Sequence, residues 1–146
     1  MHRRTPCVGI CSTTYGDLVC RGCKRFAHEV VGWNGFDDAQ RGAVWERLGE
    51  LLDGSVGKFV EVTNRELLNE RAAQLRVAQA DALSDQRLAF EVLQRSVADA
   101  TDLERVGLRS LTADCGNARE LVRGIDHEFH NRSLAHYERN YRIAAQ

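Results

Sequence analysis

Apolar residues recur every three to four positions along most of the chain, which is the spacing of one face of an α-helix. The clearest apolar stripe occupies residues 44–52, and it follows Asp37, a good N-cap residue with Gln40 three positions later. We therefore predict an amphipathic helix that begins after Asp37 and ends at Gly54 and Gly57.

Four more helix signals follow in the second half of the chain. Capping boxes that open at Thr63 and Thr101 predict a helix to about residue 79 and a short one that ends near Gly107. Ser84 can cap a helix between them, and a last long helix is expected over about 117–141. The apolar stripe residues of these segments include Leu67, Leu68, Leu75, Leu88, Ala89, Val92, Leu93, Val97, Leu121, Val122, Ile125, Phe129, Tyr137 and Tyr141.

The first 36 residues have a different pattern. Residues 12–17 are rich in turn formers and predict a loop, and only Phe26, Val30 and Trp33 form a short helical stripe, which Asn34 and Gly35 break. Residues 59–62 fit either a short strand or a helical turn, and too few segments alternate for a sheet. We predict a mainly α protein in which a small N-terminal four-cysteine metal knuckle packs on a helical body.

The chain divides accordingly into residues 1–36, a cysteine-rich metal-binding module, and residues 37–146, the helical body. Hydrophobic residues make up 43% of its 146 residues and charged residues 28%, values typical of a soluble globular protein. We find neither an apolar run long enough to span a membrane nor the apolar core of a signal peptide. We expect a cytoplasmic protein whose thiols stay reduced.

Four of the five cysteines crowd into the first 23 residues, in the spacing Cys7-x3-Cys11-x8-Cys20-x2-Cys23. Four thiolates form a soft, closed ligand set that suits Zn²⁺ or an iron–sulfur cluster. A redox dithiol of the thioredoxin type would need a βαβ pattern, which is absent. We favour one structural zinc ion, because two compact cysteine pairs serve a mononuclear tetrahedral centre well, and an iron–sulfur cluster is the alternative.

Residues next to the cysteines fit a tight metal-binding turn. Gly22 is expected to adopt a positive φ between Cys20 and Cys23, and Gly9 to ease the backbone between the first two cysteines. Lys24 and Arg25 follow at once and can stabilise thiolate charge.

Charge is distributed unevenly, although the net charge is only −1. Residues 1–33 have a formal charge of +3 and the remainder −4, and a tetrathiolate zinc site would itself carry −2. The basic excess can thus neutralise the site, so we expect a protein partner, and neither a nucleic-acid nor a membrane partner.

Two stretches of this sequence, Pro6-Cys7-Val8-Gly9-Ile10-Cys11 and Cys20-Arg21-Gly22-Cys23-Lys24-Arg25, together with Glu29, Trp33, Asp38 and Arg41, closely resemble a small bacterial domain of unknown function, family 1289. Members of that family are commonly labelled predicted Fe–S proteins, and the family's four cysteines correspond to Cys7, Cys11, Cys20 and Cys23. Residues 125–129 and 135–139 resemble the C-terminal half of longer members. The resemblance implies no catalytic residue.

Other candidate groups have simpler interpretations. Cys115 is expected to be a lone structural or surface cysteine, and His127 and His130 a solvated polar face. His28 could replace a cysteine ligand, but four thiolates already complete a tetrahedron. The aromatic residues Phe26, Trp33, Phe36 and Trp45 are expected to form a small core over the knuckle.

No phosphate-binding loop, nucleotide-binding fingerprint, nucleophile elbow or metalloprotease helix occurs in the sequence. Because a closed ligand set offers no open coordination position, we expect a non-enzymatic metal-binding protein that serves as a protein-interaction module. An iron–sulfur protein in electron transfer, cluster delivery or redox sensing is the alternative function. The partner and the oligomeric state do not follow from the sequence.

Overall fold

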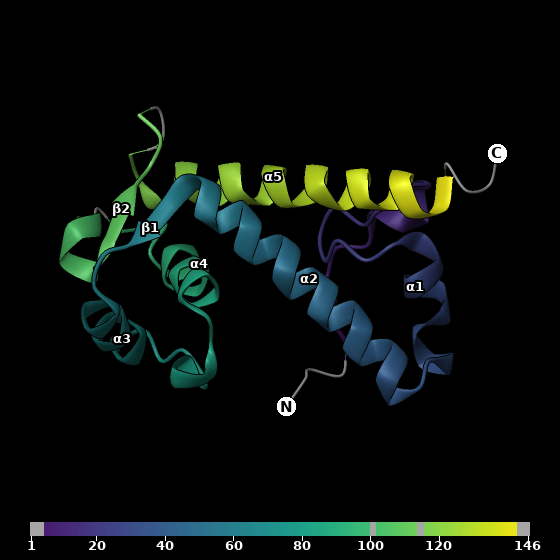
Figure 1. Ribbon diagram of the computed structural model, residues 1–146, viewed down its shortest axis with the longest axis horizontal. Coiled ribbons are helices and arrows are strands. Elements are labelled where there is room, and N and C mark those ends of the chain that lie inside the picture. The colour runs from purple at the N-terminus through teal and green to yellow at the C-terminus, as the bar shows by residue number, and fades with distance from the viewer. Residues whose placement is uncertain (1–4, 100–101, 114–115, 143–146) are drawn as a thin grey trace. The chain divides into compact units, whose positions relative to one another are not determined.

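The computed structural model describes residues 5–99, 102–113 and 116–142, and it is mainly helical, as predicted (Figure 1). In chain order the labelled elements are α1 (Ala27–Gly32), α2 (Asp38–Phe59), β1 (Val60–Val62), α3 (Arg65–Gln74), α4 (Asp85–Arg95), β2 (Leu108–Ser110) and α5 (Ala118–Tyr137). Short 3₁₀ turns lie between them, and a π-helical turn (Glu138–Arg142) follows α5. Within the described residues, no helix is long and apolar enough to cross a membrane.

Two of the predicted helix starts are confirmed by their hydrogen bonds. The Asp37 and Gln40 side chains each accept the other's backbone N–H, at 2.7 and 2.9 Å, just before α2. Ser84 Oγ accepts the N–H of Arg87 at 3.0 Å and caps α4. Each bond satisfies a donor that has no partner within the helix.

Two other starts differ from the prediction. Asn64, not Thr63, caps α3, because its Oδ1 accepts the Leu67 N–H at 3.1 Å, and α3 ends at Gln74 instead of residue 79. Thr101 lies outside the described residues. The short helix that follows it is a 3₁₀ turn (Leu103–Val106) that Asp102 caps.

The predicted end of α2 at Gly54 and Gly57 is wrong, since the helix continues through both glycines to Phe59. Val56 between them is 1% exposed, and the burial of its apolar side chain helps to offset the helix-breaking cost of the glycines, about 1 kcal/mol each. The expectation of no sheet is also wrong. β1 pairs antiparallel with β2, with Glu61 opposite Arg109, so of the ambiguous residues 59–62 Phe59 ends α2 and Val60–Val62 form a strand.

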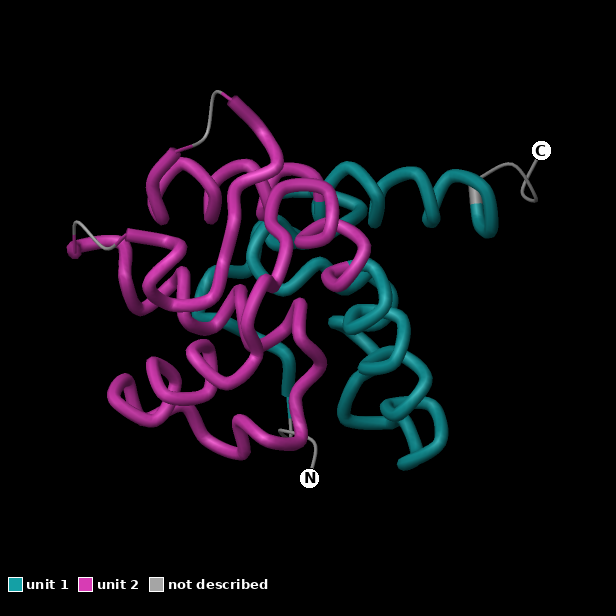
Figure 2. The backbone as a smooth tube through the Cα atoms, turned by 60° about the vertical axis from the view of Figure 1, so that its left-hand side comes forward, with its two compact units in different colours: residues 1–51, 129–146 teal, residues 52–128 magenta. Residues whose placement is uncertain are grey.

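The chain forms two compact units, which Figure 2 colours separately. Unit 1 comprises residues 1–51 and 129–146, and unit 2 comprises residues 52–128. The predicted boundary between residues 36 and 37 concerns independent folding, and it stays a prediction.

Unit 1 has its core where α2 begins. Trp33, Val44 and Leu48 are buried there, and the partly buried Phe36, Trp45 and Phe129 pack against them. Phe26 is fully buried and contacts the rings of His136, Tyr137 and Tyr141. The aromatic residues therefore form core, as expected.

Unit 2 buries residues of α3, α4, β2 and α5. Leu68, Leu88, Leu93, Leu108, Leu121 and Ile125 are all at most 1% exposed. The stripe predicted for residues 88–97 is the buried face of α4 from Leu88 to Leu93, but Val97 lies beyond the end of the helix and is 37% exposed. The stripe predicted for α5 is buried at Leu121 and Ile125.

Candidate metal centre

The second cysteine pair lies in a tight turn closed by backbone hydrogen bonds. Cys20 N–H donates to the Arg25 carbonyl and Lys24 N–H to the Cys20 carbonyl, both at 2.9 Å. Val19 and Phe26 form a β-bridge at the base of this turn. Lys24 has a φ of +67°, a left-handed conformation that is uncommon for a residue with a side chain. The positive φ expected at Gly22 thus occurs two residues later.

Glycines fit the cysteine-containing arm, residues 7–23, for two different reasons. Gly22 has no positive φ, but a Cβ there would lie 2.7 Å from the Ile10 carbonyl oxygen and 2.8 Å from the Val8 side chain. Gly22 therefore lets the second cysteine turn approach the backbone that joins the first pair. Gly9 does have a positive φ, +92°, as its expected role in easing the backbone requires.

The segment between the two pairs, predicted as a loop, is a 3₁₀ turn (Ser12–Tyr15) that supplies hydrogen-bond donors to sulfur. Cys11 Sγ lies 3.0 Å from Thr13 Oγ1, and hydrogen bonds from Thr13 and then Thr14 lower the pKa of Cys11. Burial raises the pKa of Cys20, but backbone N–H groups, including that of Ser12, outweigh it and lower this pKa to about 7. These donors favour the thiolate, the form that binds metal.

Cys23 has a charged neighbour. Arg25 Nε donates to Cys23 Sγ at 3.3 Å, and the guanidinium stacks 4.9 Å from the Trp33 ring centroid. Burial raises the pKa of Cys23, although Arg25 acts in the opposite direction. Arg25 is only 4% exposed, and among the described residues no carboxylate lies within ion-pair distance of it.

Lys24 is also buried, at 1% exposure, and its Nζ donates to the carbonyls of Arg21 and Gly22. The three cations predicted to flank the site thus differ in their exposure to solvent. Lys24 and Arg25 point into unit 1, whereas the Arg21 side chain is 72% exposed and pairs with Asp17 at 3.3 Å.

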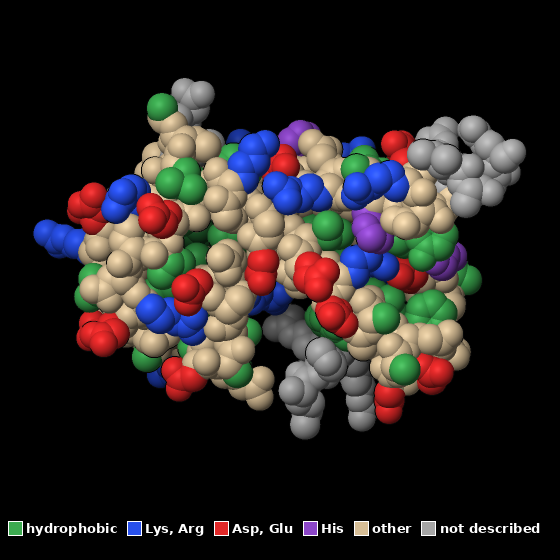
Figure 3. Space-filling model, in the orientation of Figure 1, with side chains coloured by type: hydrophobic (Ala, Val, Ile, Leu, Met, Phe, Trp, Pro, Cys, Tyr) green, Lys and Arg blue, Asp and Glu red, His purple; other side chains and the backbone are tan. Residues whose placement is uncertain are grey.

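On the face that Figure 3 shows, Lys and Arg side chains lie beside Asp and Glu side chains.

The four predicted ligands are free cysteines in unequal surroundings. Cys20 and Cys23 are buried, Cys11 is partly buried, and Cys7 is exposed. Cys20 is close to two of the others, since it is hydrogen-bonded to Cys23 and interacts electrostatically with Cys11. In the described part of the chain, however, no three His, Cys, Asp or Glu side chains are gathered as they would be around a metal ion. The predicted convergence of all four is therefore not seen.

The donor set nevertheless suits a thiophilic metal. Three sulfurs lie on one folded segment, and hydroxyl, amide and guanidinium donors already surround them. Sulfur ligands with such outer hydrogen bonds are what Zn²⁺ and iron–sulfur sites use.

Glu29 and Arg41, two of the residues that carry the family resemblance, have structural roles beside the arm. Glu29 accepts the Phe26 N–H at 2.9 Å at the start of α1 and receives two 2.6 Å hydrogen bonds from Arg47. Arg41 donates to the Trp33 carbonyl at 3.0 and 3.1 Å, where α1 has ended. No local sequence pattern identifies Arg47, whose guanidinium lies over the Phe26 ring, because its partners lie far from it in the chain.

The other candidate residues are not brought to the cysteines. His28 contacts the rings of Tyr141 and Phe26 at 5.0 and 5.9 Å and lines an open hollow of about 480 Å³ with Glu29, Arg47 and His136. Burial and then the nearby Arg47 lower the pKa of His136. On α5, His127 is exposed and His130 partly buried. Cys115 lies outside the described residues.

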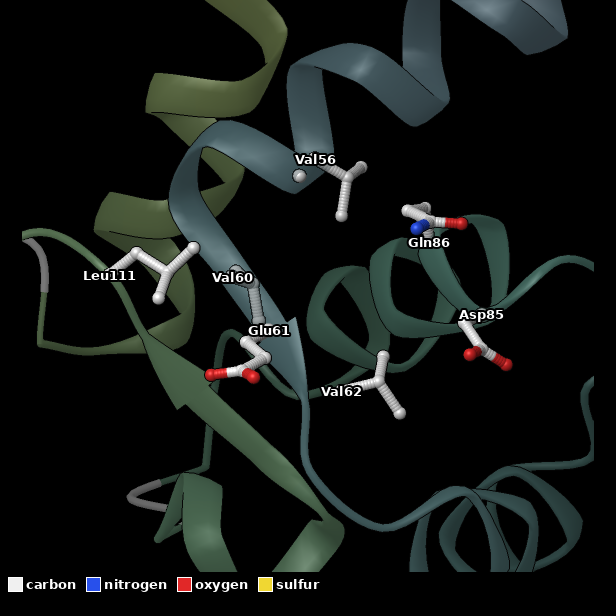
Figure 4. A pocket seen from close by; sticks show the side chains of 8 residues that line it. Val56, Val60, Glu61, Val62, Asp85, Gln86 and Leu111 are labelled. Atoms are coloured by element: carbon white, nitrogen blue, oxygen red, sulfur yellow. The ribbon is translucent and has the colours of Figure 1, made fainter.

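A second hollow, of about 520 Å³, lies in unit 2 between the end of α2, β1 and the start of α4 (Figure 4). Valine and leucine side chains make up its apolar lining. Its carboxylates are compensated, since Asp85 pairs with Arg65 at 2.5 Å and Glu61 lies 3.7 Å from Arg109. Because the remaining polar lining residue is Gln86, this hollow offers no nucleophile with a base.

A comparison with protein families matches residues 5–52 to the model described as Protein of unknown function (DUF1289). Residues 5–52 form a DUF1289 domain. The four cysteines, the short helix α1 and the first part of α2 all fall within it. The resemblance predicted for residues 125–139 lies outside the matched range. No curated protein and no solved structure matches the chain.

Proposed function

We propose that the DUF1289 domain of this chain holds one Zn²⁺ through Cys7, Cys11, Cys20 and Cys23, and that the chain acts as a non-enzymatic protein-interaction module. The metal would supply local folding energy to the arm, because the loop between the cysteine pairs has few apolar residues to bury. The proposal places the protein in a reducing compartment such as the cytoplasm, where thiols remain available for metal.

The contact between Arg25 and Cys23 carries this proposal. A buried guanidinium is costly unless an anion compensates it, and the anion is normally a carboxylate. Among the residues that the structure describes, the group that accepts a hydrogen bond from the Arg25 guanidinium is a cysteine sulfur, at 3.3 Å. A neutral thiol compensates no charge, but a metal-bound thiol is deprotonated outright. A loaded site would therefore provide the negative charge that Arg25 needs.

The interaction role is supported by apolar side chains that the arm exposes. Val8, Ile10 and Tyr15 are 60%, 66% and 91% exposed, and Leu18 is 45% exposed. All four come from the same stretch as the cysteines. Exposed apolar side chains that gather in one segment are typical of a surface that a partner covers.

The proposal is tested by purifying the full chain without oxygen and measuring its metal content. About one zinc per chain is expected. Cys20→Ser should remove it. Arg25→Gln should weaken zinc retention against a chelator by about 10–100-fold, the usual effect of losing an outer-shell donor. Arg21→Gln is the matched control, because this neighbouring cation is exposed and should change retention little.

Two results would contradict the proposal. Stoichiometric iron and sulfide, with a brown colour, would replace zinc by an iron–sulfur cluster on the same ligands and favour a redox or cluster-delivery role. If the Arg25→Gln and Arg21→Gln proteins retain zinc equally well, buried Arg25 does not stabilise a metal-bound thiolate, and the observation that carries the proposal is lost.

A further inference from the structure

The open hollow of about 480 Å³ in unit 1 is formed by two parts of the chain that are far apart in the sequence. The DUF1289 domain supplies most of its lining, from α1 and from the part of α2 between Gln40 and Glu50. His136 and Tyr141, which lie outside the matched residues 5–52, complete it. Its volume falls within the range of about 300–1,000 Å³ that is usual for binding pockets, so a side chain of another molecule fits there.

The most buried charges of this lining compensate each other. The Glu29 and Arg47 side chains are 6% and 14% exposed, and two hydrogen bonds of 2.6 Å join them. Because both charges are already matched, this part of the hollow has no need of an ion from outside.

The rim of the hollow differs, because α2 places two carboxylates there without a counter-charge. Glu46 and Glu50 lie four positions apart, so their side chains are neighbours on one face of the helix, and both residues are exposed. Among the residues that the structure describes, no cation lies within ion-pair distance of either carboxylate. Like charges at this spacing repel, and a cation between them removes the repulsion. The rim therefore favours a positively charged ligand.

Aromatic rings also line the hollow. Tyr141 is 43% exposed and its ring lies 5.0 Å from that of His28, whereas Phe36 is partly buried. A cation is attracted to the face of an aromatic ring, and the apolar stem of a long basic side chain packs against such rings. Rings beside uncompensated carboxylates therefore fit the side chain of a lysine or an arginine.

An ion pair within the chain shows why arginine suits this combination better. The planar Arg47 guanidinium lies 4.0 Å from the centroid of the Phe26 ring while it donates to both carboxylate oxygens of Glu29. The ammonium group of lysine is a compact point charge, and it has no flat face to stack on a ring. A guanidinium can thus use the ring and the carboxylates of the hollow at the same time.

We infer that this hollow binds an arginine side chain of a partner protein, and that the guanidinium pairs with the Glu46 and Glu50 carboxylates beside the Tyr141 ring. The inference rests on the interaction role in the proposed function, and it depends on no bound metal. It also gives the end of the chain a part in binding, since Tyr141 lies outside the DUF1289 domain.

The experiment titrates the isotope-labelled full chain with the peptide acetyl-Ala-Arg-Ala-amide and follows the backbone amide signals by NMR. Saturable shifts are expected at residues that line the hollow, including Ala43, Glu46, Glu50 and Tyr141. The same peptide with citrulline in place of arginine keeps the shape but loses the charge. It should bind at least about tenfold more weakly, because charge-assisted hydrogen bonds are lost. The lysine peptide should also bind more weakly than the arginine peptide.

Two double variants separate this site from general effects of charge. Glu46→Gln with Glu50→Gln should weaken binding of the arginine peptide by about tenfold or more. Glu70→Gln with Glu104→Gln, at exposed positions of unit 2, is the matched control, because it changes the net charge by the same amount. This control should leave the binding unchanged, and far-UV circular dichroism verifies that both variants are folded.

Three results would overturn the inference: no saturable shifts at the hollow, equal binding of the arginine and citrulline peptides, or equal weakening by the two double variants. A lysine peptide that binds as tightly as the arginine peptide would contradict the choice of arginine. The metal content of the same sample separates this inference from the proposed zinc site. A zinc-loaded chain that does not bind the arginine peptide refutes the inference alone, whereas a chain that binds the peptide but no zinc refutes the zinc site alone.

Discussion

Glu29 and Arg47 make the ion pair whose removal should most disturb unit 1. Their side chains are 6% and 14% exposed, and two hydrogen bonds of 2.6 Å join them across 18 positions of the sequence. Glu29 also accepts the Phe26 N–H at 2.9 Å. The Arg47 guanidinium lies 4.0 Å from the centroid of the Phe26 ring. One carboxylate thus connects the start of α1 to the middle of α2.

Glu29→Gln isolates the charge, because the glutamine oxygen can still accept the Phe26 N–H. The change leaves the partly buried Arg47 guanidinium without its counter-charge, and the cost should approach the value of about 3–5 kcal/mol that is typical of a fully buried pair. Glu29→Ala also removes the acceptor for the buried N–H and should cost a further 1–3 kcal/mol or so. Combining Glu29→Gln with Arg47→Met should recover much of the loss, since an apolar pair of similar volume needs no compensation.

Urea unfolding followed by tryptophan fluorescence measures this effect in the right place, because Trp33 and Trp45, the two tryptophans of the chain, both belong to unit 1. Glu50→Gln, at an exposed position of α2, is the control and should change the unfolding free energy by less than about 0.5 kcal/mol. A loss below about 1 kcal/mol for Glu29→Gln, the value of a surface pair, would refute the reasoning.

Three further predictions concern the arm and one histidine. Gly22→Ala should loosen zinc retention against a chelator, because its Cβ would meet the Ile10 carbonyl oxygen at 2.7 Å, whereas Gly42→Ala, which meets no atom within 4 Å, should leave retention unchanged. Cys20→Ser should disorder the arm but keep most far-UV helical signal; loss of that signal would show that the helices need the metal. The NMR-measured pKa of His136 should lie below its ordinary value of 6.5. The unfolded chain then binds more protons, so stability should fall as pH drops through 6.5, and His136→Gln should flatten that slope.

Local interactions explain which parts of the fold the sequence predicted. The starts of α2 and α4 were found because Asp37 and Ser84 cap helices through partners only three residues away. The apolar residues 88–93 were placed on a buried face for the same reason, since helical periodicity is a property of a short window. The cysteine spacing likewise indicated a candidate site without any knowledge of the tertiary structure.

The sequence-based predictions of secondary structure failed where contacts with distant residues, or burial, outweighed the local conformational preference of the chain. Gly54 and Gly57 are helix breakers in isolation, but α2 continues through both, and the burial of the apolar Val56 between them opposes their cost. The strand β1 could not be decided from its own residues. Its partner β2 lies nearly fifty positions further along the chain.

The sequence by itself determined a mainly helical chain with four clustered thiols and basic residues beside them. Only the tertiary structure decided that Arg25 is buried against Cys23 and Trp33 while Arg21 is exposed, because burial depends on what packs over a turn. It also showed that Cys7 is exposed, Cys11 partly buried, and Cys20 and Cys23 buried, a difference in solvent exposure that the cysteine spacing does not predict. Spacing limits how closely ligands can approach, but their actual positions depend on contacts formed elsewhere in the fold.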